Sequence, residues 1–149
     1  MKADDPLPIL ISNLADLTRM SAWLEESYNR CRLIDAGQVH SAEHAEAVEA
    51  FTSRFARTID LLANKVLRAL DLVELEPSGS LLDVLNRAEA RALVDSSERL
   101  REMKNLRNTA HDYVGEKLPE TFAACVEFAP QLLAVAKRVQ DYCTRFRNR

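Results

Sequence analysis

The sequence predicts an all-α protein, an antiparallel bundle of four main helices plus a short fifth helix. Apolar residues recur at three- and four-residue steps along most of the chain, the pattern of amphipathic helices. Only three Gly and five Pro occur in 149 residues, so helix breakers are few. No segment shows the strict alternation that is typical of a half-buried strand. We expect residues 1–149 to form one domain, because a chain of this length can bury a core without disulfides or metals.

The first two helices are expected to be the longest. The first covers about residues 9–34, and Gly37 follows it as a left-handed C-cap. The second begins at Ser41, whose hydroxyl suits an N-cap, and runs to about Leu75. The Pro-Ser-Gly stretch after Leu75 then ends this helix.

Three further helices complete the predicted bundle. A short helix is expected over residues 80–93, and a fourth from residues 96–97 to near Gly115. The last helix begins at Leu118, where the following proline is acceptable in a first turn. Pro130 falls inside this helix and is expected to kink it.

Charge and cysteine content restrict the classes of function. The net charge of −3 argues against a general nucleic-acid coat, although residues 96–149 carry ten Lys/Arg against seven Asp/Glu. The three cysteines, Cys31, Cys125 and Cys143, are far apart and odd in number, so neither a disulfide framework nor a zinc knuckle is indicated. Cys31 and Cys125 have apolar neighbours and are expected to be small core residues.

The N-terminal sequence does not have the features of a secretory signal. In MKADDPLPILISNL, two aspartates and two prolines interrupt the stretch that would have to be continuously apolar. No apolar run approaches the length that spans a membrane. We therefore expect a cytoplasmic protein that has no membrane partner.

The sequence favours neither of two metal-site patterns known from helical proteins. His40, Glu43 and His44 form H-x-x-E-H, the order found in inverted zinc peptidases. The expected N-cap at Ser41 places His40 before the helix, so the two imidazoles do not share one helix face. A di-iron bundle would use Glu-x-x-His, which this sequence lacks. We expect neither a metal nor another cofactor.

The segment RNTAHDY, residues 107–113, carries the strongest candidate site. On a helix, Arg107 and His111 lie one turn apart on the same face. Histidine can transfer a proton near neutral pH, and arginine can hold two phosphate oxygens at once. This pair therefore suits phosphodiester chemistry. Asn108 adds a hydrogen-bonding amide, and Tyr113 adds a hydroxyl.

These residues resemble the signature of the HEPN superfamily, and most closely that of its HepT-like bacterial members. The signature is an arginine, a polar residue, a short gap, and a histidine that is often followed by x-Tyr. Arg107, Asn108, His111 and Tyr113 match it in order. The resemblance implies a small all-α bundle, in agreement with the predicted fold.

The resemblance also implies a function. HepT-like proteins are metal-independent endoribonucleases, the toxins of toxin–antitoxin pairs with a minimal nucleotidyltransferase. Carried over, Arg107 and His111 would be catalytic on RNA, with Asn108 in support, at an interface between the two protomers of a homodimer. Tyr113 would be the residue to which the partner attaches AMP.

The spacing in this chain leaves alternatives open. The family usually has four to six residues between arginine and histidine, whereas RNTAH has three. One residue fewer turns Arg107 by about 100° around a helix, and Lys104 is a possible auxiliary cation. The second hypothesis is a non-catalytic HEPN protein that binds a nucleotidyltransferase or presents substrate to it. The third is a helical scaffold, in which Arg107 and His111 only favour a helix C-terminus.

Overall fold

The computed structural model describes residues 5–109 and 116–147, with the backbone alone for residues 107–109. Within these ranges the chain is helical and contains no strand. The α-helices are α1 (Leu7–Cys31), α2 (Ala45–Asp60), α3 (Leu67–Val73), α4 (Leu81–Ala90), α5 (Ser97–Thr109) and α6 (Leu118–Cys143). A π-helical segment, η2 (Leu61–Val66), joins α2 to α3, and two short 3-10 turns are η1 (Ala36–Gln38) and η3 (Thr144–Phe146).

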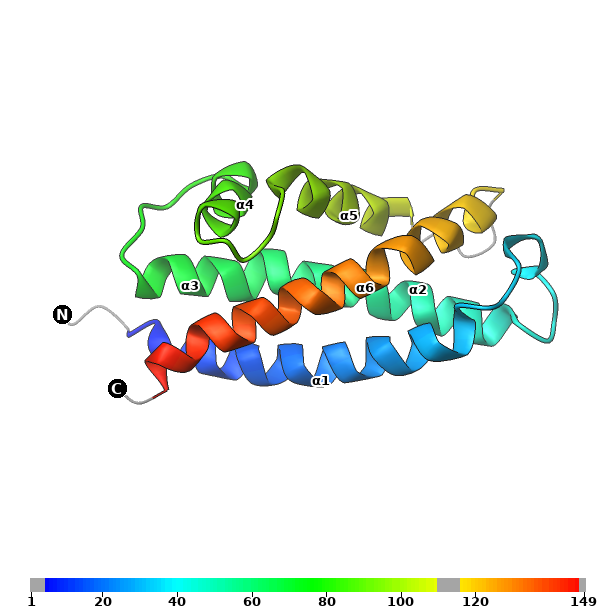
Figure 1. Cartoon of the computed structure of the whole chain (residues 1–149), viewed down its shortest axis with the longest axis horizontal. Helices are drawn as coiled ribbons and strands as arrows, with labels where there is room; N and C mark the ends of the chain where they lie inside the picture. The colour runs from blue at the N-terminus through cyan, green and yellow to red at the C-terminus, as the bar shows by residue number, and fades with distance from the viewer. Residues whose placement is uncertain (1–4, 110–115, 148–149) are drawn as a thin grey trace.

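The predicted bundle is confirmed. Because α2, η2 and α3 follow one another without a break, they form one long rod, and the four main helices are α1, this rod, α5 and α6. Figure 1 shows these four running in alternating directions, with the start of α1 and the end of α6 at the same end of the molecule. The short fifth helix, α4, packs against α3 and α5.

One hydrophobic cluster gathers buried side chains from all six α-helices. Its largest members include Phe51 and Phe122, whose rings meet edge to face at 5.8 Å between α2 and α6. Cys31 and Cys125 are fully buried within the cluster, which confirms that they are core residues. Burial raises the pKa of the Cys125 thiol to about 12, because a thiolate is poorly solvated there.

Two of the predicted helix ends are wrong. Gly37 is not a left-handed C-cap, because α1 already ends at Cys31 and no described glycine has a positive φ. Instead, the Asp35 side chain accepts a hydrogen bond from the Gly37 N–H and begins η1. Ser41 is not the N-cap of α2, which begins four residues later with His44 at the cap. The Ser41 carbonyl accepts the backbone N–H groups of His44 and Ala45, so a turn precedes the helix.

Other predicted ends agree with the structure. Ser80 begins α4 through a capping box, since its hydroxyl accepts from the Asp83 N–H while the Asp83 carboxylate accepts from the Ser80 N–H. These hydrogen bonds hold the pKa of the Asp83 carboxyl below its usual value. Pro130 lies inside α6 without ending it. Of the helices in the described ranges, none combines the length and the apolar character needed to cross a membrane.

Candidate functional site

The candidate motif begins on α5, which is fixed to the bundle by its apolar face. Leu100 and Met103 are fully buried, and Leu106 packs against the same core from a partly buried position. The helix contacts α2, α4 and α6. The C-terminal end of α5 is therefore held against the middle of the molecule and does not project as a free helix end.

Arg107 and Asn108 occupy the last turn of α5. Arg107 follows Met103 by four residues and Lys104 by three, so its backbone position shares the helix face of these two residues. His111 and Tyr113, the other two predicted site residues, lie outside the described residues. The predicted end of the helix near Gly115 lies outside them as well.

Lys104 turns toward α2. Its ammonium group donates a hydrogen bond to Asp60 Oδ1, and both side chains are more than two-thirds buried. Asp60, the last residue of α2, also accepts from the Asn64 amide at 3.3 Å. Lys104, considered from the sequence as an auxiliary cation, is thus engaged in an ion pair that joins α5 to the long rod.

A groove runs between α1 and the rod on the side where Asp60 lies. Its volume is about 500 Å³. Two turns of α1 form one wall, and the end of α2 with the start of η2 forms the other. The lining residues are Asp16, Arg19, Met20, Trp23, Arg57, Asp60, Leu61, Asn64 and Lys65. The groove thus combines an aromatic and aliphatic floor with charged rims.

The π-helical segment shapes this groove. The Leu67 N–H donates to the carbonyl of Leu62, five residues earlier, where an α-helix would use the residue four earlier. The segment supplies three of the lining residues, Leu61, Asn64 and Lys65. Single π turns inside α-helices occur often at functional sites, so the groove is a second candidate site.

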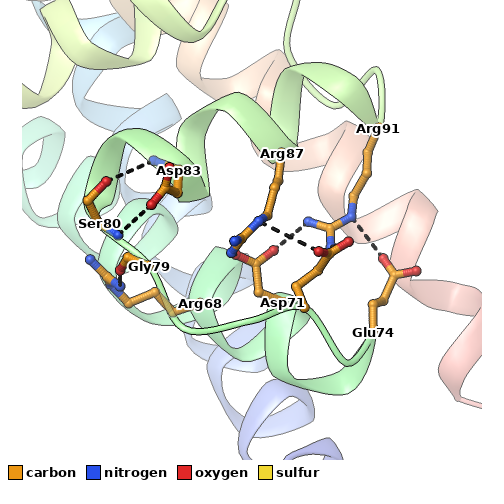
Figure 2. Close-up of polar contacts among 9 residues, drawn as sticks. Arg68, Asp71, Glu74, Gly79, Ser80, Asp83, Arg87 and Arg91 are labelled. Carbon is orange, nitrogen blue, oxygen red and sulfur yellow. Dashed lines mark hydrogen bonds and ion pairs between the residues drawn. The ribbon is translucent and has the colours of Figure 1, made fainter.

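A polar cluster lies at the C-terminal end of the rod, where α4 packs on α3 (Figure 2). Asp71 is 4% exposed and accepts from Arg87 at 3.0 Å and from Arg91 at 2.6 Å. Arg91 also pairs with Glu74 at 3.0 Å. Glu74 in turn accepts from the Tyr142 hydroxyl at 2.6 Å, which ties α6 to the cluster.

The cluster also shifts the pKa values of two of its members. Burial lowers the pKa of the Arg91 guanidinium, but the hydrogen bond and the charge of Asp71 outweigh burial and hold that pKa above its ordinary value. Burial and the bond to Glu74 raise the pKa of Tyr142. Asp71 binds both Arg87 and Arg91, and Glu74 binds both Arg91 and Tyr142, so the cluster fastens α4 and α6 to α3. Arg91 Nη2 is buried and has no hydrogen-bond partner among the described residues.

The histidine pattern of a zinc peptidase is not assembled. His40 is exposed in the turn before α2, and His44 is the N-cap residue with its Nε2 4.0 Å from Glu43. Among the described residues, no group of three or more His, Cys, Asp or Glu side chains is placed to hold a metal ion.

The sequence reasoning missed the groove and the buried ionic cluster. The aspartate of ALDLVEL, Asp71, stands in an apolar run, and the spacing of Arg87 and Arg91 puts both on one helix face. These signals could have indicated a buried ion pair. The groove had one signal, the lone tryptophan Trp23 among charged residues on the polar side of α1.

Comparison with known proteins does not assign this chain to a family. No protein-family model, curated protein sequence or solved structure matches this chain.

Proposed function

We propose that this chain is a HepT-like HEPN protein that acts as a metal-independent endoribonuclease toxin. The observation that carries the proposal is the sequence order Arg107, Asn108, His111, Tyr113 in a chain that folds as an all-α bundle, with Arg107 and Asn108 in the last described turn of α5. The fold, the antiparallel arrangement and the packing of α5 on α2 support it.

The chemistry needs no bound cofactor. The 2′-hydroxyl of a ribose attacks the adjacent phosphorus, the bond to the 5′-oxygen breaks, and a 2′,3′-cyclic phosphate and a 5′-hydroxyl result. His111 transfers the proton, and Arg107 stabilises the charge that develops on the phosphate oxygens. Asn108 orients the phosphate, and two protomers bring their motifs together in a homodimer.

Lys104 supports the assignment of the phosphate cation to Arg107. The ammonium group of Lys104 is committed to Asp60, so recruiting it to a phosphate would break a largely buried ion pair. Arginine also offers the bidentate geometry that lysine lacks.

The test is cleavage of a single-stranded RNA by the purified chain in EDTA. We expect wild-type protein to release 2′,3′-cyclic ends, and His111→Ala to lose about a hundredfold or more in rate. His40→Ala is the matched control, because His40 is an exposed histidine outside the motif. Equal cleavage by wild type and His111→Ala, or no cleavage by either, would contradict the catalytic role.

A specific observation favours a second function. RNTAH leaves three residues between Arg107 and His111, one fewer than the resemblance leads one to expect. A non-catalytic HEPN protein that binds a minimal nucleotidyltransferase accommodates this spacing. Such a protein would bind the partner and take up AMP from ATP on Tyr113, with release of pyrophosphate, while RNA stays intact. Both functions allow AMP on Tyr113, so RNA cleavage distinguishes them. AMP found on Tyr113 by mass spectrometry, with Tyr113→Phe as the control, supports the non-catalytic protein only if the same chain leaves RNA intact.

A further inference from the structure

The groove between α1 and the rod has the composition of a nucleotide-binding surface. Trp23 is 44% exposed there, although it is a large aromatic residue. Met20 and Leu61 continue the apolar floor beside it. The volume of about 500 Å³ falls within the range of roughly 300–1,000 Å³ of small-ligand pockets. An exposed aromatic ring beside cations is a common platform for unpaired bases.

The acidic and the basic side chains of the groove differ in whether they already have an ion-pair partner. Asp16 is paired with Arg19 at 2.9 Å, and Asp60 is paired with Lys104. Both carboxylates of the groove therefore already have cationic partners. In contrast, no ion pair joins Arg57 or Lys65 to any described carboxylate, and both side chains are exposed. The charge left over in the groove is positive.

The free cations stand on one face of the rod. Arg57, Leu61 and Lys65 follow one another at four-residue steps, so an apolar side chain lies between two cations about two helical turns apart. Next to the groove, Arg54 donates to the Trp23 carbonyl at 3.2 Å and to Ser27 Oγ at 2.8 Å. These bonds hold α1 against α2 at the level of Trp23.

The groove also lies beside the candidate catalytic helix. Asp60 lines the groove and accepts the hydrogen bond of Lys104, which precedes Arg107 by one turn of α5. A strand that lies along the groove therefore reaches the neighbourhood of the α5 end.

We infer that this groove binds a segment of single-stranded RNA, with a base stacked on Trp23 and flanking phosphates at Arg57 and Lys65. The inference deepens the proposed function and rests on it for the identity of the strand. Trp23, Arg57 and Lys65 are substrate-binding residues, distinct from the motif that cuts the strand.

The lone tryptophan makes the inference directly testable, because excitation that is selective for tryptophan over the three tyrosines reports on Trp23 alone. In the His111→Ala background, which does not cut, we expect an oligoribonucleotide of about ten nucleotides to quench this fluorescence. A duplex of the same sequence has no free base to stack and should bind at least about tenfold more weakly. Equal quenching by the duplex would overturn the inference.

Charge variants test the phosphate contacts. Arg57→Gln with Lys65→Gln should weaken binding of a labelled oligoribonucleotide about tenfold and lower the slope of log K against log salt by about 1.4, at about 0.7 per phosphate. Arg32→Gln with Lys137→Gln is the matched control, since it removes the same charge from exposed positions outside the groove. Equal weakening by both pairs would overturn the groove as the binding surface.

Trp23→Leu tests stacking while it keeps an apolar side chain in the groove. We expect binding, read by anisotropy of the labelled strand, to weaken about tenfold with an unchanged melting temperature. Unchanged binding would overturn the role of Trp23. Fluorescence that changes with protein concentration alone, together with loss of self-association in Trp23→Leu, would also overturn it, by identifying the groove as an interface between copies.

Cleavage assays separate this inference from the proposed function. Groove variants that raise KM and leave kcat unchanged support both. Binding in the groove without cleavage supports the inference and contradicts the ribonuclease. Cleavage with KM unaffected by the groove variants supports the ribonuclease and overturns the inference.

Discussion

Leu75 and Ala92 have positive φ angles, 62° and 61°, which side chains other than glycine rarely adopt. Each residue lies just after the end of a helix, and the same type of backbone hydrogen bond closes both helix ends. The Glu76 N–H donates to the carbonyl of Asp71 at 2.8 Å, and the Leu93 N–H donates to that of Ala88 at 3.0 Å. These are Schellman caps, in which glycine is the preferred residue.

Leu75→Gly and Ala92→Gly should therefore each raise the free energy of unfolding. We expect a gain of about 0.5–1 kcal/mol, because relief of the left-handed strain exceeds the extra entropy of glycine in the unfolded chain. Leu75 is 90% exposed, so its removal costs little packing. Urea denaturation measures the change. Ala22→Gly, in the middle of α1, should instead lose about 1 kcal/mol. A lower free energy of unfolding in all three variants would contradict backbone strain at Leu75 and Ala92.

Lys104 and Arg107 share one face of α5 but should respond differently to neutralisation. Lys104→Gln should lower the free energy of unfolding by about 1–3 kcal/mol, because it leaves the partly buried Asp60 without its ammonium partner. Arg107→Gln should mainly lower kcat, by about a hundredfold or more. Denaturation curves and RNA cleavage rates of both variants check this. A larger loss of kcat in Lys104→Gln would make Lys104 the phosphate cation.

At the scale of elements, the attachment of α4 to α3 depends on Asp71. Asp71→Asn should lower the free energy of unfolding by about 3 kcal/mol, because two largely buried guanidinium groups, Arg87 and Arg91, lose their shared counter-charge. Asp16→Asn is the control, since it removes the carboxylate of an exposed pair and should change stability by less than about 1 kcal/mol. Equal effects of the two variants in guanidinium denaturation would show that Asp71 does not hold α4 to α3.

The elements could be predicted where one strong local pattern decides them. The apolar spacing predicts five helical segments, and these are α1, the rod, α4, α5 and α6. The serine at the start of α4 could be predicted as well, because a capping box is a local interaction. Ser41 misled the prediction, because its carbonyl closes a turn and its side chain caps nothing described. The π turn escaped prediction, since Leu61 and Leu62 fit an apolar face in either helical form.

The candidate site could be predicted only in its local part. The apolar spacing of Leu100, Met103 and Leu106 predicts a helix that includes Arg107 and Asn108, and both lie on α5. His111 and Tyr113 lie outside the described residues, so their part of the site stays a prediction. That Lys104 meets Asp60, and that Trp23 and Lys65 line one groove, depends on how the helices pack. Residues 44 positions apart in sequence come together through tertiary contacts, and no local periodicity reports them.

At the scale of the whole molecule, buried thiols make stability depend on alkaline pH. Burial raises the pKa of Cys125 to about 12 and that of Cys143 to about 11, from 9.0. Above pH 9 the unfolded chain releases these protons while the folded chain keeps them. The free energy of unfolding should therefore be unaffected by these groups below about pH 9 and should fall as pH rises from about 9 to about 12.

Urea denaturation between pH 7 and this alkaline range measures the effect. Cys125→Ala is the informative comparison, because it should be less stable at pH 7, through loss of packing, yet show a shallower decline at high pH. A decline as steep as that of the wild type would assign the alkaline sensitivity to other groups.

The π turn within the rod also has a consequence for the length of the chain. Its hydrogen bond spans five residues, so η2 holds one residue more than a regular α-helical turn would need. Removing one residue there, such as the exposed Asn64, would restore an unbroken α-helix and leave the residues beyond it facing nearly as they do now, because the widened turn already absorbs the extra residue. The same deletion within α2, where the helix is regular, would turn Asp71 by about 100° and away from Arg87. We therefore expect the attachment of α4 to survive a single-codon deletion in η2 and to be lost after one in α2.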